Sequence, residues 1–222
     1  VAPEALAKVA RKADRAHDVE PRPGRISPLA VVMVGGDPGR IEAIRDCRAG
    51  VEDEGSQLVA LVAAHAPVEG RDARWLDLCA GPGGKAALLA ARAAQTGAQL
   101  LANEVSHHRT KLVADSVKAL PSGVVSLRTG DGRDFGEQES GSYDRILLDA
   151  PCSGLGSLRR RPESRWRKQE SDVAELASLQ RQLLLSALNA LRSGGVVAYV
   201  TCSPHVLETS LVVKDALRRF KQ

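Results

Sequence analysis

Residues 75–95 read WLDLCAGPGGKAALLAARAAQ, and this stretch decides the fold class. A short apolar run enters a turn rich in glycine, and a run of alanines and leucines follows the turn. The apolar run predicts a β-strand, the glycines predict a tight turn, and the alanine-rich run predicts a helix. A strand that passes through a glycine turn into a helix is typical of α/β domains.

The same alternation continues through the rest of the chain. The predicted strands lie at 75–79, 99–104, 124–129, 145–150 and 195–202. The predicted helices lie at 85–95, 106–119, 173–191 and 207–220. Strands that alternate with helices predict a parallel sheet covered by helices on both faces, which is the doubly wound, Rossmann-like α/β fold.

The first part of the chain shows a different pattern. A helical pattern at 3–17 is broken by prolines, and a β-rich run at 29–34 ends in a glycine-containing turn. We therefore expect a small α+β accessory module at 1–50. The main domain would cover 51–222 and would open with a capped helix at 51–64.

Composition excludes several classes of protein. The 222 residues carry a formal net charge of +4, which favours a polyanionic partner only mildly. Because the four cysteines have no spacing typical of a metal site, we expect no bound metal and free thiols in a reducing cytoplasm. No apolar run approaches the ~18 residues of a membrane span and no signal peptide is evident, so we expect no membrane partner.

The glycine turn at 81–84 favours a nucleotide-like ligand, since glycines let the backbone approach closely and a helix N-terminus attracts negative charge. A phosphate-binding P-loop would need glycine at position 79 and Ser or Thr at position 86, where the chain has Cys79 and Ala86. A dinucleotide site would need a third glycine, which is missing, although Glu104 lies where a ribose-binding acid is expected.

S-adenosylmethionine fits the pattern better. An acidic strand end with a glycine turn, here Asp77 and Gly81, would be joined by an acid after the second strand that can accept both ribose hydroxyls, here Glu104. Asp131, which follows the third strand, is placed to reach the adenine amino group. Each acid alone could be a cap or turn residue, but acids at successive strand ends together predict a cofactor site.

A basic segment follows the fourth predicted strand, within residues 147–168, LLDAPCSGLGSLRRRPESRWRK. Asp149 and Cys152 come directly after the strand and would lie at the mouth of a site. The arginines around Trp166 suit phosphate groups and a stacked base, although a solvated basic loop is the alternative. The candidate substrate-binding residues are Arg159, Arg160, Arg161, Arg165 and Trp166.

Cys152 and Cys202 both follow buried strands into turns, where a thiol pKa can be lowered, whereas Cys47 and Cys79 are expected to be inert packing. The C5 carbon of a pyrimidine is too weak a nucleophile to take a methyl group directly, so an enzyme can first add a thiolate at C6. A second group near the base can then assist release, and Asp149 could hydrogen-bond the ring's N3 and amino edge. The residues alone do not decide which thiol attacks.

Three motifs occur in a characteristic order: DLCAGPGGK at 77–85, DAPCSGLGSLRRRPESRWR at 149–167 and TCSPHVLET at 201–209. Together they resemble the bacterial Sun/Fmu family of ribosomal RNA cytosine-5 methyltransferases. The match covers roughly residues 50–220, and EDEGSQLVA at 52–60 also resembles a family segment.

The resemblance implies roles for several of these residues. Cys202 would be the attacking nucleophile, Cys152 would assist product release, and Asp149 would contact the base. DNA cytosine methyltransferases use the thiol of a Pro-Cys pair instead, so the reverse assignment is the alternative. Lys85 would help to organise the cofactor site. Family members often carry paired acids and Asn after the TCS motif, whereas this chain keeps only Glu208 there. The candidate cofactor-binding residues are Asp77, Cys79, Ala80, Gly81, Pro82, Gly83, Gly84, Lys85, Glu104, Arg109, Asp131 and Asp149.

The implied activity is transfer of a methyl group from S-adenosylmethionine to C5 of a cytosine in RNA, in particular small-subunit ribosomal RNA. The rivals are an amino-group methyltransferase on nucleic acid, which needs no thiol, and a non-catalytic RNA-binding scaffold. The module at 1–50 would be part of an RNA-binding region. Because the chain begins at Val1, and no β-hairpin of the kind that usually closes a methyltransferase sheet follows residue 220, we expect truncation at both ends.

Overall fold

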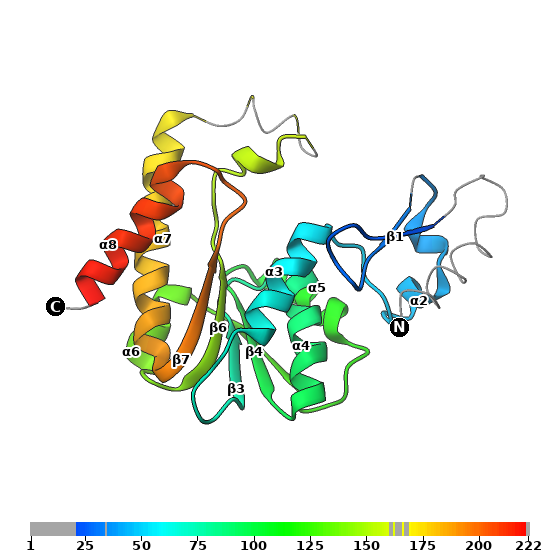
Figure 1. Cartoon of the computed structure of the whole chain (residues 1–222), viewed down its shortest axis with the longest axis horizontal. Helices are drawn as coiled ribbons and strands as arrows, with labels where there is room; N and C mark the ends of the chain where they lie inside the picture. Colours follow the sequence, from blue (N-terminus) through cyan, green and yellow to red (C-terminus); the bar gives the residue numbers. More distant parts are fainter. Residues whose placement is uncertain (1–20, 34, 160–161, 163–165, 167–168, 221–222) are drawn as a thin grey trace.

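The computed structural model describes residues 21–33, 35–159, 162, 166 and 169–220. Within them one sheet of five parallel strands forms the centre of the molecule (Figure 1). The strands are β3 (Arg74–Asp77), β4 (Gln99–Glu104), β5 (Val125–Thr129), β6 (Tyr143–Asp149) and β7 (Leu191–Val200).

The strand order across the sheet is β5-β4-β3-β6-β7. The chain runs outward from β3 to β5 and then returns to the other side of β3 with β6, so the order reverses between β3 and β6. This topology confirms the predicted doubly wound fold. In such sheets ligands bind beyond the carboxyl ends of the strands at the reversal point, which here lies between β3 and β6.

Helices cover both faces of the sheet (Figure 1). One face carries α3 (Glu54–His65), α4 (Gly84–Thr96) and α5 (His107–Val117). The other face carries α6 (Phe135–Gln138), α7 (Glu170–Ala190) and α8 (Ser210–Phe220). The helices predicted at 51–64, 85–95, 106–119 and 173–191 are therefore all present, with shifted ends.

Alternation along the central strand β6 explains the two layers. Leu147 is buried against Ala60 of α3 and Leu89 of α4, whereas Ile146 and Leu148 are buried in the cluster formed with α7 and α8. Successive side chains of a strand point to opposite faces, and a strand buried on both faces reads as a continuous apolar run.

The prediction of a single helix at 207–220 is wrong in one respect, because this segment forms two elements. A 3-10 turn, η5 (Val206–Glu208), comes first, and α8 starts at Ser210 after Thr209 leaves helical geometry at φ −121° and ψ −103°. The Glu208 side chain is fully buried and accepts hydrogen bonds from residues on other elements. These tertiary contacts outweigh the local helical pattern.

Residues 21–33 and 35–50 lie beside α3 (Figure 1). β1 (Arg22–Pro23) pairs antiparallel with β2 (Val31–Val32), and η1 (Pro38–Arg40) and α2 (Glu42–Arg45) follow. Of the strand predicted at 29–34, the described residues 29–33 contain β2. The helix predicted at 3–17 lies outside the described residues. The Glu54 carboxylate at the start of α3 accepts the backbone N–H groups of Ile26 and Ser27, at 2.9 and 3.1 Å. The boundary near residue 50 stays a prediction.

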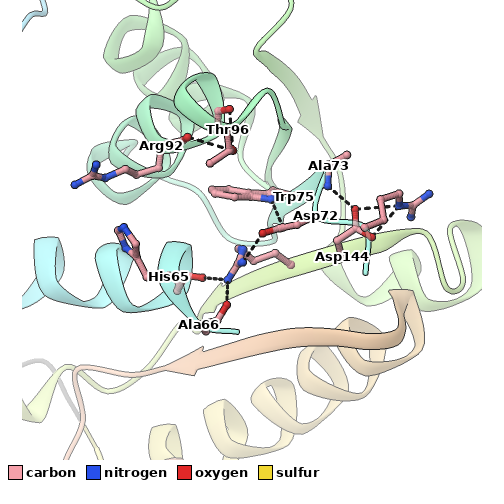
Figure 2. A network of polar contacts seen from close by, with 12 residues as sticks. His65, Ala66, Asp72, Ala73, Trp75, Arg92, Thr96 and Asp144 are labelled. Carbon is pink, nitrogen blue, oxygen red and sulfur yellow. Dashed lines mark hydrogen bonds and ion pairs between the residues drawn. The ribbon is translucent and has the colours of Figure 1, made fainter. Parts of the chain in front are cut away.

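A polar network ties the amino edge of the sheet together (Figure 2). The buried Asp144 carboxylate of β6 accepts the backbone N–H groups of Ala73 and Arg74 at 2.8 and 2.7 Å, and it pairs with Arg71 and Arg192. These contacts hold the start of β3 against β6 and β7 and stabilise the amino edge of the sheet, which is opposite the edge where ligands bind in such folds.

Candidate functional site

The glycine turn connects β3 to α4 at the carboxyl edge of the sheet. Gly83 has a left-handed φ of 118° and serves as the N-cap of α4. A Cβ atom on Gly81 would lie 2.3 Å from Glu104 Oε2 and 2.8 Å from Arg109 Nε, so the turn has no room for a side chain there. The backbone N–H of Ala80 donates to the carbonyl oxygen of Asn103 in β4 at 2.8 Å. The turn is therefore held tightly against the end of β4.

Glu104 and Arg109 meet at this turn. Glu104 accepts the backbone N–H groups of Gly81 and Ser106, each at 3.0 Å, and its Oε2 lies 3.4 Å from Arg109 Nη1. Arg109 also donates to the carbonyl oxygen of Gly81. Glu104 is nearly fully buried, yet a carboxylate can accept about four hydrogen bonds. It therefore keeps the capacity to accept a ligand's hydroxyl groups.

Asp77, the last residue of β3, is 1% exposed, and neither of its carboxylate oxygens has a hydrogen-bond partner among the described residues. Burial, together with the nearby charge of Asp149, raises the pKa of Asp77 to about 8, and the positive charge of Lys85 offsets this only in part. A buried carboxyl group without a partner costs free energy. This position therefore suits a ligand that brings a positive charge or hydrogen-bond donors.

Asp131 lies after β5, where it caps the 3-10 turn η2 (Gly132–Asp134) by accepting the backbone N–H of Arg133 at 2.9 Å. Hydrogen bonds from the Arg133 side chain lower the pKa of Asp131. The structure thus gives Asp131 a capping role and an arginine partner, and its predicted contact with adenine stays a prediction.

Cys79 lies in the same turn but is packed against the apolar core. Burial, reinforced by the carboxyl groups of Asp77 and Glu104, raises the pKa of the Cys79 thiol far above its ordinary value. Such a thiol stays protonated and unreactive. The side chain of Cys79 therefore contributes packing, as expected from the sequence.

Lys85 connects the glycine turn to the end of β6. Its Nζ lies 2.9 Å from Asp149 Oδ2 and 3.2 Å from Ser56 Oγ of α3. The carboxylate of Glu52 also faces this cluster and packs against Gly84. Burial raises the pKa of Glu52 to about 7, although Lys85 acts in the opposite direction. Sequence reasoning did not assign Glu52 and Ser56 to the site, and only the resemblance of EDEGSQLVA indicated their segment.

Cys152 and Cys202 come together at the ends of β6 and β7. Their sulfur atoms are 3.3 Å apart, and no disulfide joins them. Cys202 is exposed, and Cys152 is partly exposed. β6 and β7 are neighbours in the sheet, so the two thiols that follow them lie at the same edge.

The two thiols titrate as a pair. The hydrogen bond with Cys202 lowers the pKa of Cys152 to about 6 against the opposing effect of burial, and the Thr201 side chain and the Gly154 backbone N–H add to this. The same hydrogen bond, together with burial, raises the pKa of Cys202. The contact therefore favours ionisation of Cys152 and disfavours ionisation of Cys202.

The basic segment is described only in part. Arg159 is exposed, and Trp166 is 86% exposed. Arg160, Arg161 and Arg165 lie outside the described residues. A tryptophan so open to solvent does not serve the core, and this leaves it available to a ligand.

Among the described residues, no helix combines the length and the apolar character that a membrane span needs. Within the same residues no group of three or more His, Cys, Asp or Glu side chains is arranged to hold a metal ion.

The residues at this edge fit S-adenosylmethionine. Asp77 is a buried acceptor without a partner, the absence of a side chain at Gly81 lets the turn pack closely against Glu104 and Arg109, and Glu104 keeps acceptor capacity. A parallel doubly wound sheet with this edge defines a Rossmann-like domain of the S-adenosylmethionine-dependent methyltransferase class. Within that class the chain belongs to the 16S rRNA methyltransferase RsmB/F family, whose family model matches residues 63–222.

Two proteins that are similar in sequence support the membership of this family. A Mycobacterium tuberculosis protein, Rv1407, named provisionally as a methyltransferase, is 57% identical over 196 residues, which cover 88% of this chain and 42% of the relative. The Escherichia coli ribosomal RNA small subunit methyltransferase B is 43% identical over 148 residues, which cover 65% of this chain and 33% of that protein. The chain thus spans less than half the length of these relatives.

Solved structures give the same fold. The crystal structure of PH0851 superposes with a TM-score of 0.86 at 28% identity, over 97% of this chain and 47% of the other. NSun6 from Pyrococcus horikoshii, solved with the S-adenosylmethionine analogue SFG, superposes with a TM-score of 0.71 at 26% identity, over 86% of this chain and 49% of the other. These likenesses extend over most of the described chain.

Proposed function

We propose that this chain is the catalytic part of an enzyme that methylates C5 of a cytosine in small-subunit ribosomal RNA. The observation that carries the proposal is the approach of the Cys152 and Cys202 sulfurs to 3.3 Å, beside the Lys85–Asp149 ion pair. Methylation of an amino group needs no thiol, whereas methylation at C5 of a pyrimidine needs one to activate the ring. Family membership and the name of the Escherichia coli relative support ribosomal RNA as the substrate.

The cofactor would be held by the residues around the glycine turn. Bound S-adenosylmethionine supplies an electrophilic methyl group on its sulfonium. Asp77 would accept hydrogen bonds from the cofactor, Glu104 would accept from the ribose hydroxyls, and Gly81 lets the backbone approach. Asp131 would accept from the adenine amino group with the lone pairs that Arg133 leaves free.

The thiols would act in sequence on the base. Cys202 loses its proton to solvent and its sulfur forms a bond to C6, and the C5–C6 electron pair moves onto C5, which then takes the methyl group. The Cys152 thiolate takes the C5 proton, and the electron pair of that bond re-forms the C5–C6 double bond. The Cys202–C6 bond breaks, and the departing sulfur recovers the proton held by Cys152. Asp149, oriented by Lys85, would accept a hydrogen bond from the cytosine amino group.

Access to C6 requires the cytosine to be unstacked. Proteins that act on a base in RNA select single-stranded or opened sites and stack exposed bases on aromatic side chains. The exposed Arg159 and Trp166 lie between Cys152 and Cys202 in the sequence and would contact the RNA. We propose base stacking for Trp166 and phosphate contact for Arg159, together with Arg160, Arg161 and Arg165.

The test is a denaturing gel of labelled RNA with S-adenosylmethionine and the full-length protein as parent, Cys152→Ala, Cys202→Ala or Cys47→Ala. We expect a denaturation-resistant protein–RNA band to accumulate in Cys152→Ala, because the adduct forms but is not released. The band should be absent in Cys202→Ala, and Cys47→Ala should match the parent.

Two other outcomes have defined meanings. A band that accumulates in Cys202→Ala and vanishes in Cys152→Ala would exchange the two roles but keep the reaction. Methylation that survives the loss of both thiols would rule out the proposed chemistry and indicate transfer to an amino group.

A further inference from the structure

Glu208 lies beneath both cysteine turns and is not used by the chemistry described above. Its side chain is fully buried, at 0% exposure. A buried carboxylate is retained only where hydrogen bonds compensate for its desolvation. The identity of its partners therefore indicates what Glu208 holds in place.

The first set of partners comes from the turn that carries Cys152. Glu208 Oε1 accepts the backbone N–H of Ser153 at 2.8 Å, and Oε2 accepts the Ser153 hydroxyl at 2.5 Å. Ser153 follows Cys152 directly in the chain, so a shift of this carboxylate would move the Cys152 turn.

The second set comes from the turn that carries Cys202 and from α7. Ser153 Oγ lies 3.1 Å from Ser203 Oγ, next to Cys202. Gln180 of α7 donates from Nε2 to Glu208 Oε1 at 3.0 Å and to the carbonyl oxygen of Pro151 at 2.8 Å. The hydroxyl of Tyr199 on β7 donates to the Glu208 carbonyl oxygen at 2.7 Å. Glu208 thus connects the Cys152 turn and α7 through its side chain, β7 through its carbonyl oxygen, and the Cys202 turn through Ser153.

Burial opposes the charge of Glu208, but the hydrogen bonds from Ser153, Ser203 and Gln180 outweigh it and lower the pKa of Glu208. The carboxylate is therefore ionised at neutral pH. The carboxylate accepts several hydrogen bonds at once and so matches the donors around it. An amide has only one acceptor oxygen and would match them only in part.

We infer that Glu208 is a positioning residue, which fixes the relative placement of the Cys152 and Cys202 sulfurs by holding their two turns on α7. The inference rests on the proposed function for its catalytic meaning, because the sulfurs must exchange a proton across 3.3 Å. The placement itself can be measured without RNA or cofactor.

The experiment measures the effective molarity of the two thiols. The full-length protein is equilibrated with reduced and oxidised glutathione, and the Cys152–Cys202 disulfide is quantified by peptide mass spectrometry. Oxidised glutathione takes up the two electrons and two protons of the thiols. Glu208→Ala should lower the effective molarity at least about tenfold, and Glu208→Gln, which keeps the volume and one acceptor oxygen, by about threefold.

Asp144→Asn is the matched control, because Asp144 is an equally buried carboxylate at the opposite edge of the sheet. It should lower Tm while changing the effective molarity by less than about twofold. The inference would be overturned if Glu208→Gln kept the parental effective molarity, or if Asp144→Asn lowered it as much as Glu208→Gln. Loss of methylation with unchanged effective molarity would also count against it.

The methylation assay separates this inference from the proposed function. If Glu208→Gln lowers both the effective molarity and kcat, with KM for S-adenosylmethionine unchanged, the positioning role is supported. If the parent protein forms no RNA adduct at all, the proposed function fails, yet the thiol measurement still decides whether Glu208 positions the pair.

Discussion

Cys152 Sγ lies 3.3 Å from Cys202 Sγ although 50 residues separate them in the chain. β6 and β7 are neighbours in the sheet and run in parallel, so both chains leave it at the same edge. A thiol that donates a hydrogen bond to a second sulfur stabilises the thiolate form of that sulfur, so this contact should shift the pKa of both cysteines.

The rate at which Cys152 is alkylated should depend on pH, and the midpoint of this dependence should change when Cys202 is removed. With the pKa of Cys152 lowered to about 6 by its hydrogen bond with Cys202, the thiolate predominates above that pH. In Cys202→Ala the pKa of Cys152 should rise toward the ordinary value of about 8.5, and alkylation at pH 7 should slow by about tenfold. Iodoacetamide labelling of the Cys152 peptide across the pH range measures this. An unchanged midpoint in Cys202→Ala would contradict it.

Asp77→Asn should stabilise the protein without cofactor while weakening cofactor binding. The folded-state pKa of about 8 lies above the unfolded-state value, so ionisation of Asp77 favours the unfolded chain as pH rises from about 4 to 8. The gain in Tm should therefore grow over this range and be absent near pH 4. Calorimetric titration with S-adenosylmethionine should show at least about tenfold weaker binding. A variant less stable than the parent at pH 8 would argue against an unpaired carboxyl group.

Gly81→Ala should abolish most cofactor affinity without unfolding the domain. Its Cβ would lie 2.3 Å from Glu104 Oε2, so the predicted ribose acceptor would have to move. We expect binding at least about tenfold weaker by titration calorimetry. Gly50→Ala is the control, because a Cβ there meets nothing within 4 Å. Equal affinity in both variants would refute a cofactor role for the turn.

Asp144→Asn should destabilise the fold and leave the thiols unaffected. Burial opposes ionisation of Asp144, but the backbone N–H groups of Arg74 and Ala73 and the side chains of Arg192 and Arg71 lower its pKa to about 2. We expect a loss of about 2–4 kcal/mol at neutral pH, measured by urea unfolding. Because the folded-state pKa is depressed, the loss should shrink as pH falls from about 4 toward 2. A constant difference over that range would contradict the assignment.

Much of the fold follows from local pattern. The order of strands and helices was predictable because apolar periodicity and glycine turns act over a few residues, and β4 occupies the predicted 99–104. Strand and helix ends were less accurate: β7 begins at Leu191 rather than 195, and Thr209 interrupts the last helix. In both cases contacts with distant elements outweigh the local preference.

The sequence by itself determined which chemical groups follow each strand: Asp77 with the glycine turn, Glu104, Asp149 with Cys152, and Cys202. Only the tertiary structure decided how they meet. The strand order sets the 3.3 Å contact of the sulfurs and the ion pair of Lys85 with Asp149. It also buries Asp77 without a partner and places Glu208 beneath both cysteine turns. The physical reason is that hydrogen bonding and desolvation depend on distances between residues remote in the chain, and no local pattern encodes these distances.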